Sequence, residues 1–176
     1  MTRSNLLLCI IGTLTGCVTE PEIPPTLQAR AAMSQALESA PGEVVTFFDS
    51  PVLQDGTGPT DEDAPKEFTT TASGLQYRIL RQSDGAKPTA SNTVKVNYRG
   101  WLDNGTKFDG SYNKEPISFP LTRVIGGWTE GLQLVGVGGM IELWIPAELG
   151  YGSAGSGGSV PPNATLHFIV ELLEVN

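Results

Sequence analysis

The sequence predicts an α+β domain in which an antiparallel β-sheet wraps around one short α-helix. Apolar and polar residues alternate with a period of two in several stretches after Gly74, which is typical of strands buried on one face. Only one stretch of this region has a helical pattern, and turn-forming residues separate the predicted strands. Several antiparallel strands with a single helix define this class of fold.

The first two predicted strands carry the clearest alternation, and a tight turn follows them. The residues expected on the apolar side are Leu75, Tyr77 and Ile79 in the first strand and Val94, Val96 and Tyr98 in the second. Asp103-Asn104-Gly105 has the composition of a tight hairpin turn, because these residues tolerate a left-handed backbone. The turn is expected to send the chain back toward Phe108.

The remaining elements follow in a regular order. The sequence favours a strand over 117–121, a short helix over 128–135 that ends at Gly136 and Gly138-Gly139, and further strands over 140–145 and 165–175. The last of these is expected to close the sheet.

The N-terminus has the features of an export signal. Arg3 precedes an apolar run that is too short to cross a bilayer as a helix, and the run ends at Leu14-Thr15-Gly16-Cys17. These four residues resemble the bacterial lipobox, which implies that residues 1–16 form a lipoprotein signal peptide and that Cys17 carries the lipid anchor. The alternatives are an ordinary cleaved signal or a buried apolar helix. Val18 resembles the sorting pattern of outer-membrane lipoproteins, so we expect the protein in the cell envelope, anchored to the outer membrane and facing the periplasm.

Residues 17–66 are expected to form an acidic tether ahead of a domain over 67–176. Residues 18–67 contain ten Asp or Glu and two Lys or Arg, with prolines spaced so that long elements are interrupted. A marginal helix is favoured over 26–40, with a dimerisation helix as the alternative. The apolar run over 44–48 is either a short strand or a latch against the domain.

Charge and cysteine content exclude several classes of function. The 176-residue chain has a formal net charge of -8, and it lacks the clustered basic residues that bind nucleic acid. Both cysteines lie within the first 17 residues, so neither a disulfide nor a cysteine-based metal site can stabilise the body of the protein. We expect no metal and no cofactor.

Five segments, in order, resemble the landmark stretches of the FKBP-type peptidyl-prolyl cis-trans isomerases. They are 94–100 (VKVNYRG), 105–109 (GTKFD), 124–128 (VIGGW), 150–152 (GYG) and 161–168 (PPNATLHF). The resemblance implies a half-barrel sheet, isomerisation of X-Pro bonds in exported polypeptides, and a monomer. It also makes macrolides such as tacrolimus or rapamycin candidate ligands.

The resemblance further implies an apolar pocket with Trp128 as its floor. The implied substrate-binding residues are Tyr98, Phe108, Asp109, Ile117, Val124, Ile125, Trp128, Tyr151, Val160 and Phe168. Of these, Asp109 and Tyr151 are the implied catalytic residues: the Tyr151 phenol and the Ile125 backbone N–H contact substrate carbonyls, and Asp109 orients the site. Considered without the family, any single one of these aromatic residues is better explained as part of an ordinary core.

Other candidate sites are weaker. The letters GxGxxG occur at 150–155, but Pro161-Pro162 and a strand follow where a dinucleotide fold needs a helix. His167 is expected on the opposite sheet face, as a surface residue. Ile117, Ser156 and Ser159 depart from the commonest family pattern and leave a smaller, more polar pocket rim. This rim favours the rival hypothesis, a non-catalytic chaperone or docking module.

Overall fold

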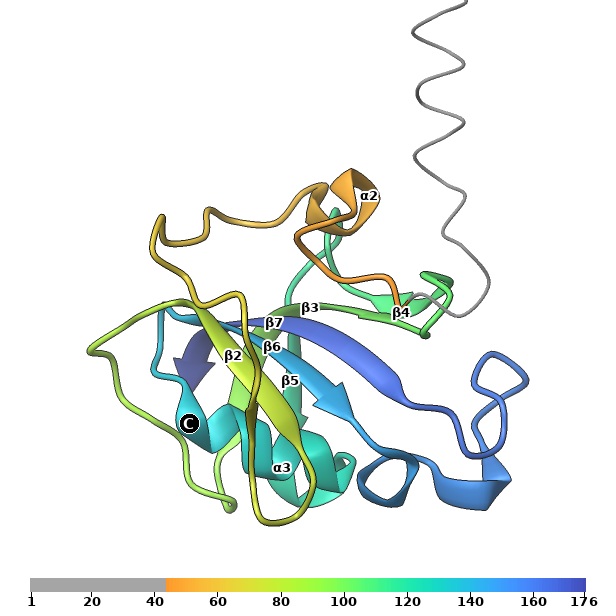
Figure 1. The fold of residues 1–176 in the computed structure, drawn as a ribbon. Coiled ribbons are helices and arrows are strands. Elements are labelled where there is room, and N and C mark those ends of the chain that lie inside the picture. Colours follow the sequence, from red (N-terminus) through yellow and green to blue (C-terminus); the bar gives the residue numbers. More distant parts are fainter. Residues whose placement is uncertain (1–43) are drawn as a thin grey trace, which may run out of the picture. The chain divides into compact units, whose positions relative to one another are not determined.

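The computed structural model describes residues 44–176, which form one antiparallel sheet with a short helix on its concave side (Figure 1). The strands are β1 (Thr69–Thr70), β2 (Gln76–Arg81), β3 (Thr93–Trp101), β4 (Lys107–Gly110), β5 (Ile117–Pro120), β6 (Met140–Ile145) and β7 (Leu166–Val175). The helices are α2 (Pro51–Gln54) and α3 (Gly126–Gly131), with short 3-10 turns η1 (Leu121–Arg123), η2 (Leu132–Leu134), η3 (Ala147–Leu149) and η4 (Gly152–Ala154). The predicted fold class is confirmed.

Six of the seven strands follow the order β1-β2-β6-β7-β3-β4, and β5 pairs with residues 93–96 of β3, on the same edge as β4. Strand β7 is central, with β6 on one side and β3 on the other. The predicted strand over 140–145 is confirmed without change, and the strand predicted over 165–175 begins one residue later. The helix predicted over 128–135 instead starts at Gly126 and tightens into η2 after Gly131.

The main core lies between the concave face of the sheet and α3. Val94, Val96 and Tyr98, which the alternation placed together, all belong to it. Helix α3 lies very close to β6, because a Cβ atom on Gly127 would come within 2.5 Å of the Ile145 Cγ2 atom. This glycine therefore sets how deeply the helix, and with it Trp128, sits in the curve of the sheet.

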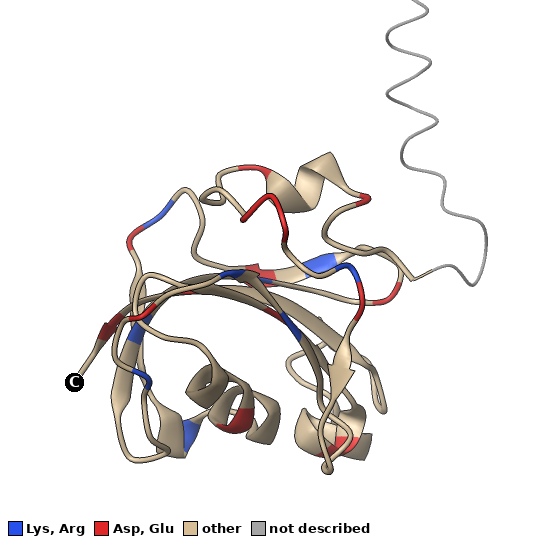
Figure 2. Cartoon of the chain, turned by 60° about the vertical axis from the view of Figure 1, so that its left-hand side comes forward, with Lys and Arg blue, Asp and Glu red and all other residues tan. Residues whose placement is uncertain are grey.

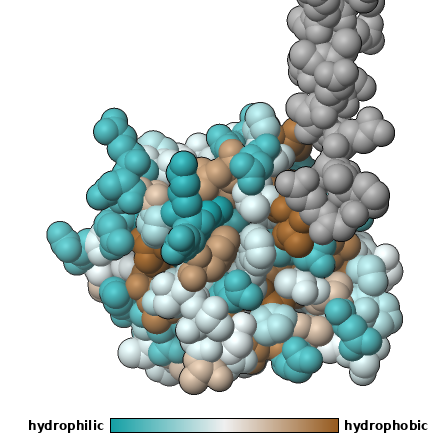
Figure 3. Space-filling model, in the orientation of Figure 1, coloured by the Kyte–Doolittle hydropathy of each residue, from teal (hydrophilic) through white to brown (hydrophobic). Residues whose placement is uncertain are grey.

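A second core covers the convex face. Phe47 and Leu53 come from residues 44–66, which we call the strap, and they pack against the sheet residues Leu80, Trp101 and Ile169. Figure 2 shows the strap crossing the face opposite to α3, with several acidic residues along it. On the face drawn in Figure 3, hydrophilic residues predominate and hydrophobic ones appear in small separate groups.

The strap corrects the expectation of a solvated tether up to residue 66. The run over 44–48 is a latch and has no strand pairing, since Phe47 is 2% exposed and lies in a turn. The predicted boundary at residue 67 thus falls inside the folded unit. The physical reason is that several strands carry apolar residues on both faces, and the convex set needs a cover. The predicted signal, Cys17 and the predicted helix over 26–40 lie outside the described residues.

Polar contacts hold the strap along its length. The Trp101 indole N–H donates to the Val45 carbonyl at 2.9 Å. The Arg99 guanidinium donates to the carbonyls of Val52, Leu53 and Asp55, which satisfies the C-terminal end of the four-residue α2. These contacts bind strand β3 to the strap on the convex side of the sheet.

A buried carboxylate fastens the next part of the strap. Glu171 on β7 accepts hydrogen bonds from the Gly58 N–H and the Tyr112 hydroxyl, both at 2.8 Å, and pairs with Arg81 at 2.9 Å. Arg81 also donates to the Pro59 carbonyl. The carboxylate therefore joins the strap to two strands of the sheet.

His167 differs from its predicted surface position. It is on the convex face as expected, but it is fully buried, stacked on Trp101 with its Nε2 bonded to Asp103 at 2.5 Å. Its Nδ1 has no partner among the described residues, which favours the neutral ring with its proton on Nε2, facing Asp103. Sequence alternation gave the correct face and could not show that a second layer covers it.

We expect the stabilisation that His167 and Glu171 provide to fall as the pH is lowered, against an opposite contribution from Glu142, whose pKa burial raises above its ordinary value. Burial lowers the pKa of His167 below its ordinary 6.5, and Asp103 offsets only part of that effect. Burial alone would raise the pKa of Glu171, but hydrogen bonds from Gly58, Arg81 and Tyr112 hold it below its ordinary 4.5. For both groups the pKa is lower in the folded protein than in the unfolded chain, so the unfolded chain binds the proton more readily. The stabilisation that each group provides is complete above its ordinary pKa and is lost as the pH falls through its pKa in the folded state.

Urea unfolding at a series of pH values checks this expectation. In Glu171→Gln the free energy of unfolding should depend less on pH below 4.5. The loss of stability due to His167, which begins near pH 6.5, should remain. The same pH dependence of stability in the wild type and in Glu171→Gln would contradict the assignment for Glu171.

Candidate functional site

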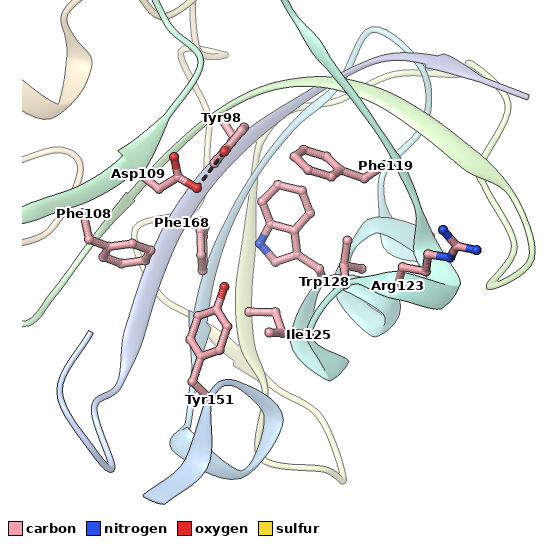
Figure 4. Close-up of a pocket in the computed structure, with 10 residues that line it drawn as sticks. Tyr98, Phe108, Asp109, Phe119, Arg123, Ile125, Trp128, Tyr151 and Phe168 are labelled. Atoms are coloured by element: carbon pink, nitrogen blue, oxygen red, sulfur yellow. Dashed lines mark hydrogen bonds between the residues drawn. The ribbon is translucent and has the colours of Figure 1, made fainter. Parts of the chain in front are cut away.

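Five aromatic rings converge inside the curve of the sheet (Figure 4). Trp128, on α3 and 4% exposed, stands nearly perpendicular to three of them, with centroid separations of 5.2 Å to Tyr98, 5.6 Å to Phe119 and 5.3 Å to Phe168. Phe108 meets Phe168 edge to face at 5.4 Å. Such edge-to-face pairs stabilise the cluster beyond the burial of its apolar surface.

Strand register brings these rings together. On β3, Gly100 pairs with Asp109 of β4 on one side and with Phe168 of β7 on the other. A Cβ atom on Gly100 would lie 2.7 Å from both the Phe108 Cζ and the Phe168 Cε1 atoms. Glycine is therefore required here so that the two phenylalanine rings can meet over the strand.

The polar edge of the cluster is formed by Tyr98 and Asp109. The Tyr98 hydroxyl donates to the Asp109 Oδ2 atom at 2.8 Å. Burial, and then the hydrogen bond to Asp109 and its negative charge, raise the pKa of Tyr98 well above the ordinary 10. The phenol thus stays protonated and holds the carboxylate in one orientation at the cavity edge.

Two further donors lie near the cavity mouth. Tyr151, just before η4, is 39% exposed, and Figure 4 shows its hydroxyl pointing toward the aromatic cluster. Ile125 is the N-cap residue of α3, and its backbone N–H has no hydrogen-bond partner among the described residues. Both groups are therefore free to donate to a bound molecule.

Together these residues enclose an open cavity of about 380 Å³. Its lining consists of Tyr98, Phe108, Asp109, Phe119, Arg123, Val124, Ile125, Trp128, Tyr151 and Phe168. The volume suits a small apolar group held by a few polar contacts. In the described part of the chain, no cluster of three or more His, Cys, Asp or Glu residues is placed to hold a metal ion.

The structure brings together eight of the ten residues expected at the pocket. The two others do not line the cavity: Ile117 lies on β5, 38% exposed, and Val160 is 5% exposed within the main core. The cavity also contains two residues that the sequence analysis missed. Phe119 lies two residues beyond Ile117 on the same strand, so the alternation carried a signal for it. Arg123 follows in η1, where no periodicity indicated a role.

The segment 150–155 forms no nucleotide-binding motif. Gly152–Ala154 is a single 3-10 turn, followed by an isolated bridge between Ser156 and Val160, and no helix begins there. Within residues 44–176, no helix has the length and apolar character needed to cross a bilayer.

Comparison with known proteins places the cavity in a family context. Residues 85–173 match the family described as FKBP-type peptidyl-prolyl cis-trans isomerase. A probable FKBP-type isomerase of Haemophilus influenzae is 52% identical over 112 residues, which cover 63% of this chain and 46% of the relative. The chain spans about half the length of the curated relatives it matches.

Solved structures agree. The crystal structure of FkpA from Escherichia coli is 50% identical and superposes with a TM-score of 0.61, covering 64% of this chain and 53% of that one. A peptidyl-prolyl cis-trans isomerase of Pseudomonas syringae is 28% identical and superposes with a TM-score of 0.60. The match covers 88% of this chain and 98% of the Pseudomonas chain.

Proposed function

The chain belongs to the FKBP-type peptidyl-prolyl cis-trans isomerases, and from this premise we propose that it catalyses rotation about X-Pro bonds in exported polypeptides. One observation carries the proposal. The cavity combines an aromatic floor and walls, sized for a pyrrolidine ring, with hydrogen-bond donors at its mouth. It contains no nucleophile activated by a base, and the proposed reaction needs none.

The reaction requires a twisted amide and breaks no covalent bond. Rotation about a peptide C–N bond faces a barrier of roughly 18–20 kcal/mol because resonance keeps the amide planar. A catalyst need only bind the twisted form more tightly than either planar form. The ring of proline packs on Trp128, and the apolar walls exclude the water that favours the polar, planar amide.

Each polar group has one task in this mechanism. The Tyr151 hydroxyl and the Ile125 N–H bind substrate carbonyls and fix the peptide on either side of the proline. Asp109, oriented by the Tyr98 hydroxyl, provides a fixed negative charge at the cavity edge. Ile117 and Val160 stay outside this scheme, because they do not line the cavity. Macrolides such as tacrolimus or rapamycin are proposed to compete for the same apolar floor.

Tyr151→Phe tests the assignment of the phenol. The variant keeps the ring and removes one hydrogen bond, so we expect kcat/KM for a short X-Pro peptide to fall by up to about tenfold, with unfolding unchanged. Tyr77→Phe removes a phenol outside the cavity and serves as the control. Unchanged turnover in Tyr151→Phe would remove Tyr151 from the mechanism. Binding of unfolded chains without turnover in the wild type would favour the docking-module alternative.

We also propose that Cys17 anchors the protein as a lipid-modified monomer, on the outer membrane and facing the periplasm. Several acyl chains on one residue hold a protein firmly, whereas a single chain holds it only marginally. Cys17→Ser should therefore move the protein from the membrane pellet to the soluble fraction, with the domain still folded. A variant whose signal is removed but which stays in the pellet after a high-salt wash would overturn the lipid anchor.

A further inference from the structure

Two charged residues line the cavity, and they lie at opposite ends of it. Figure 4 places Asp109 beside Phe108 at one end and Arg123 beyond Trp128 at the other. They make no ion pair with each other. A peptide that spans the aromatic floor therefore meets a negative charge at one end and a positive charge at the other.

The fold does not use the charge of Arg123. Arg78, Arg81 and Arg99, the three other arginines of residues 44–176, are all bound to carboxylates or carbonyls. Arg123 is exposed and has no hydrogen bond or ion pair with any described residue. Its guanidinium is thus available to a ligand, at the edge of a site where every other lining residue except Asp109 is uncharged.

Asp109 is less available to a positively charged substrate group than Arg123 is to a negatively charged one. Its Oδ2 already accepts from the Tyr98 hydroxyl and its Oδ1 from the Gly110 N–H, both at 2.8 Å. An arginine guanidinium, by contrast, offers five donors in a planar fork that matches a carboxylate. The charge selectivity of the site therefore depends on the Arg123 end.

We propose that Arg123 makes this site prefer X-Pro segments that carry an acidic side chain within two residues of the proline. The acidic side chain lies on the part of the peptide that leaves the cavity next to η1. This inference rests on the proposed isomerase function. The effect is local, because the chain as a whole has a net charge of -8 and would otherwise repel acidic peptides. Acidic side chains gain a partner there, and lysine at the same position is repelled.

The test compares peptides that differ in one residue. Glu, Gln or Lys is placed one or two residues before the proline in two sets of peptides, and one or two residues after it in two others. The value of kcat/KM is measured by protease-free exchange NMR with the full chain. In at least one set, Glu should exceed Gln by about two- to fivefold, the size expected for one solvent-exposed ion pair, and Lys should fall below Gln. The preference should shrink at 1 M salt.

Variants separate this inference from the proposed function. Arg123→Gln should abolish the preference and Arg123→Glu should invert it. Lys114→Gln makes the same change in charge at an exposed position outside the cavity and should keep the preference. If wild type and Arg123→Gln give equal Glu-to-Lys ratios in every set, the inference is overturned and the isomerase stands. If wild type isomerises no Gln peptide, the proposed function itself fails.

Discussion

Phe47→Ala is expected to lower the free energy of unfolding by about 3–5 kcal/mol, as truncating a buried aromatic does. Val52→Ala, five residues away on the same strap and 51% exposed, should change it by less than about 0.5 kcal/mol. The contrast follows from the second core, in which Phe47 covers the convex face of the sheet. Urea or thermal unfolding of both variants measures it.

Truncation extends the same test. A chain that starts at residue 44 should unfold like the full protein, whereas one that starts at 67 should be several kcal/mol less stable, because Trp101 and Ile169 become exposed and Glu171 loses its Gly58 partner. The loss should also reduce turnover, since the strap braces β3 and β7, which carry Tyr98 and Phe168. Equal stability of the two truncated chains would show that the strap does not contribute to the free energy of unfolding.

Trp128→Ala is expected to have the largest effect on turnover. The indole contacts Tyr98, Phe119 and Phe168, so its removal takes away the cavity floor and destabilises the fold by about 3–5 kcal/mol. At a temperature where the variant is still folded, we expect kcat/KM for an X-Pro peptide to fall at least as far as in Tyr151→Phe. Isomerisation kinetics beside thermal unfolding separate the two effects.

Trp144→Ala provides the matched control for that experiment. Trp144 is a partly buried tryptophan of β6 that packs against Phe68 and His167 on the convex side. Its truncation should cost stability while turnover per folded molecule stays within about twofold. If both tryptophan variants lose turnover in proportion to lost stability, the pocket assignment of Trp128 fails.

The concave half of this molecule could be predicted from the sequence because its signals are local. Alternation placed Val94, Val96 and Tyr98 on one face, and the composition of 103–105 matches an observed hairpin turn with Gly105 at a φ of 78°. Resemblance to the family then named eight lining residues that come from different strands, loops and α3. No period along the chain could have brought those segments together.

The convex half was misjudged for a physical reason. The strap is acidic and rich in proline, which is also the composition of a solvated tether, and its attachment depends on a few buried residues such as Phe47 and Leu53. The available signal lay in the sequence of β7: apart from His167 and Glu171, every residue from Leu166 to Leu172 is apolar, and the structure buries all seven positions. A strand buried on both faces requires a layer on each side, so a cover over His167 could have been inferred.

The rate of cis-trans isomerisation of a short X-Pro peptide tests the central claim most directly. It is measured near 10 °C, where the uncatalysed reaction takes minutes, at increasing concentrations of the full chain. The pocket described above predicts a rate that rises in proportion to protein concentration. A rate equal to the uncatalysed one at every concentration, from protein that shows a normal unfolding transition, would contradict catalysis at this site.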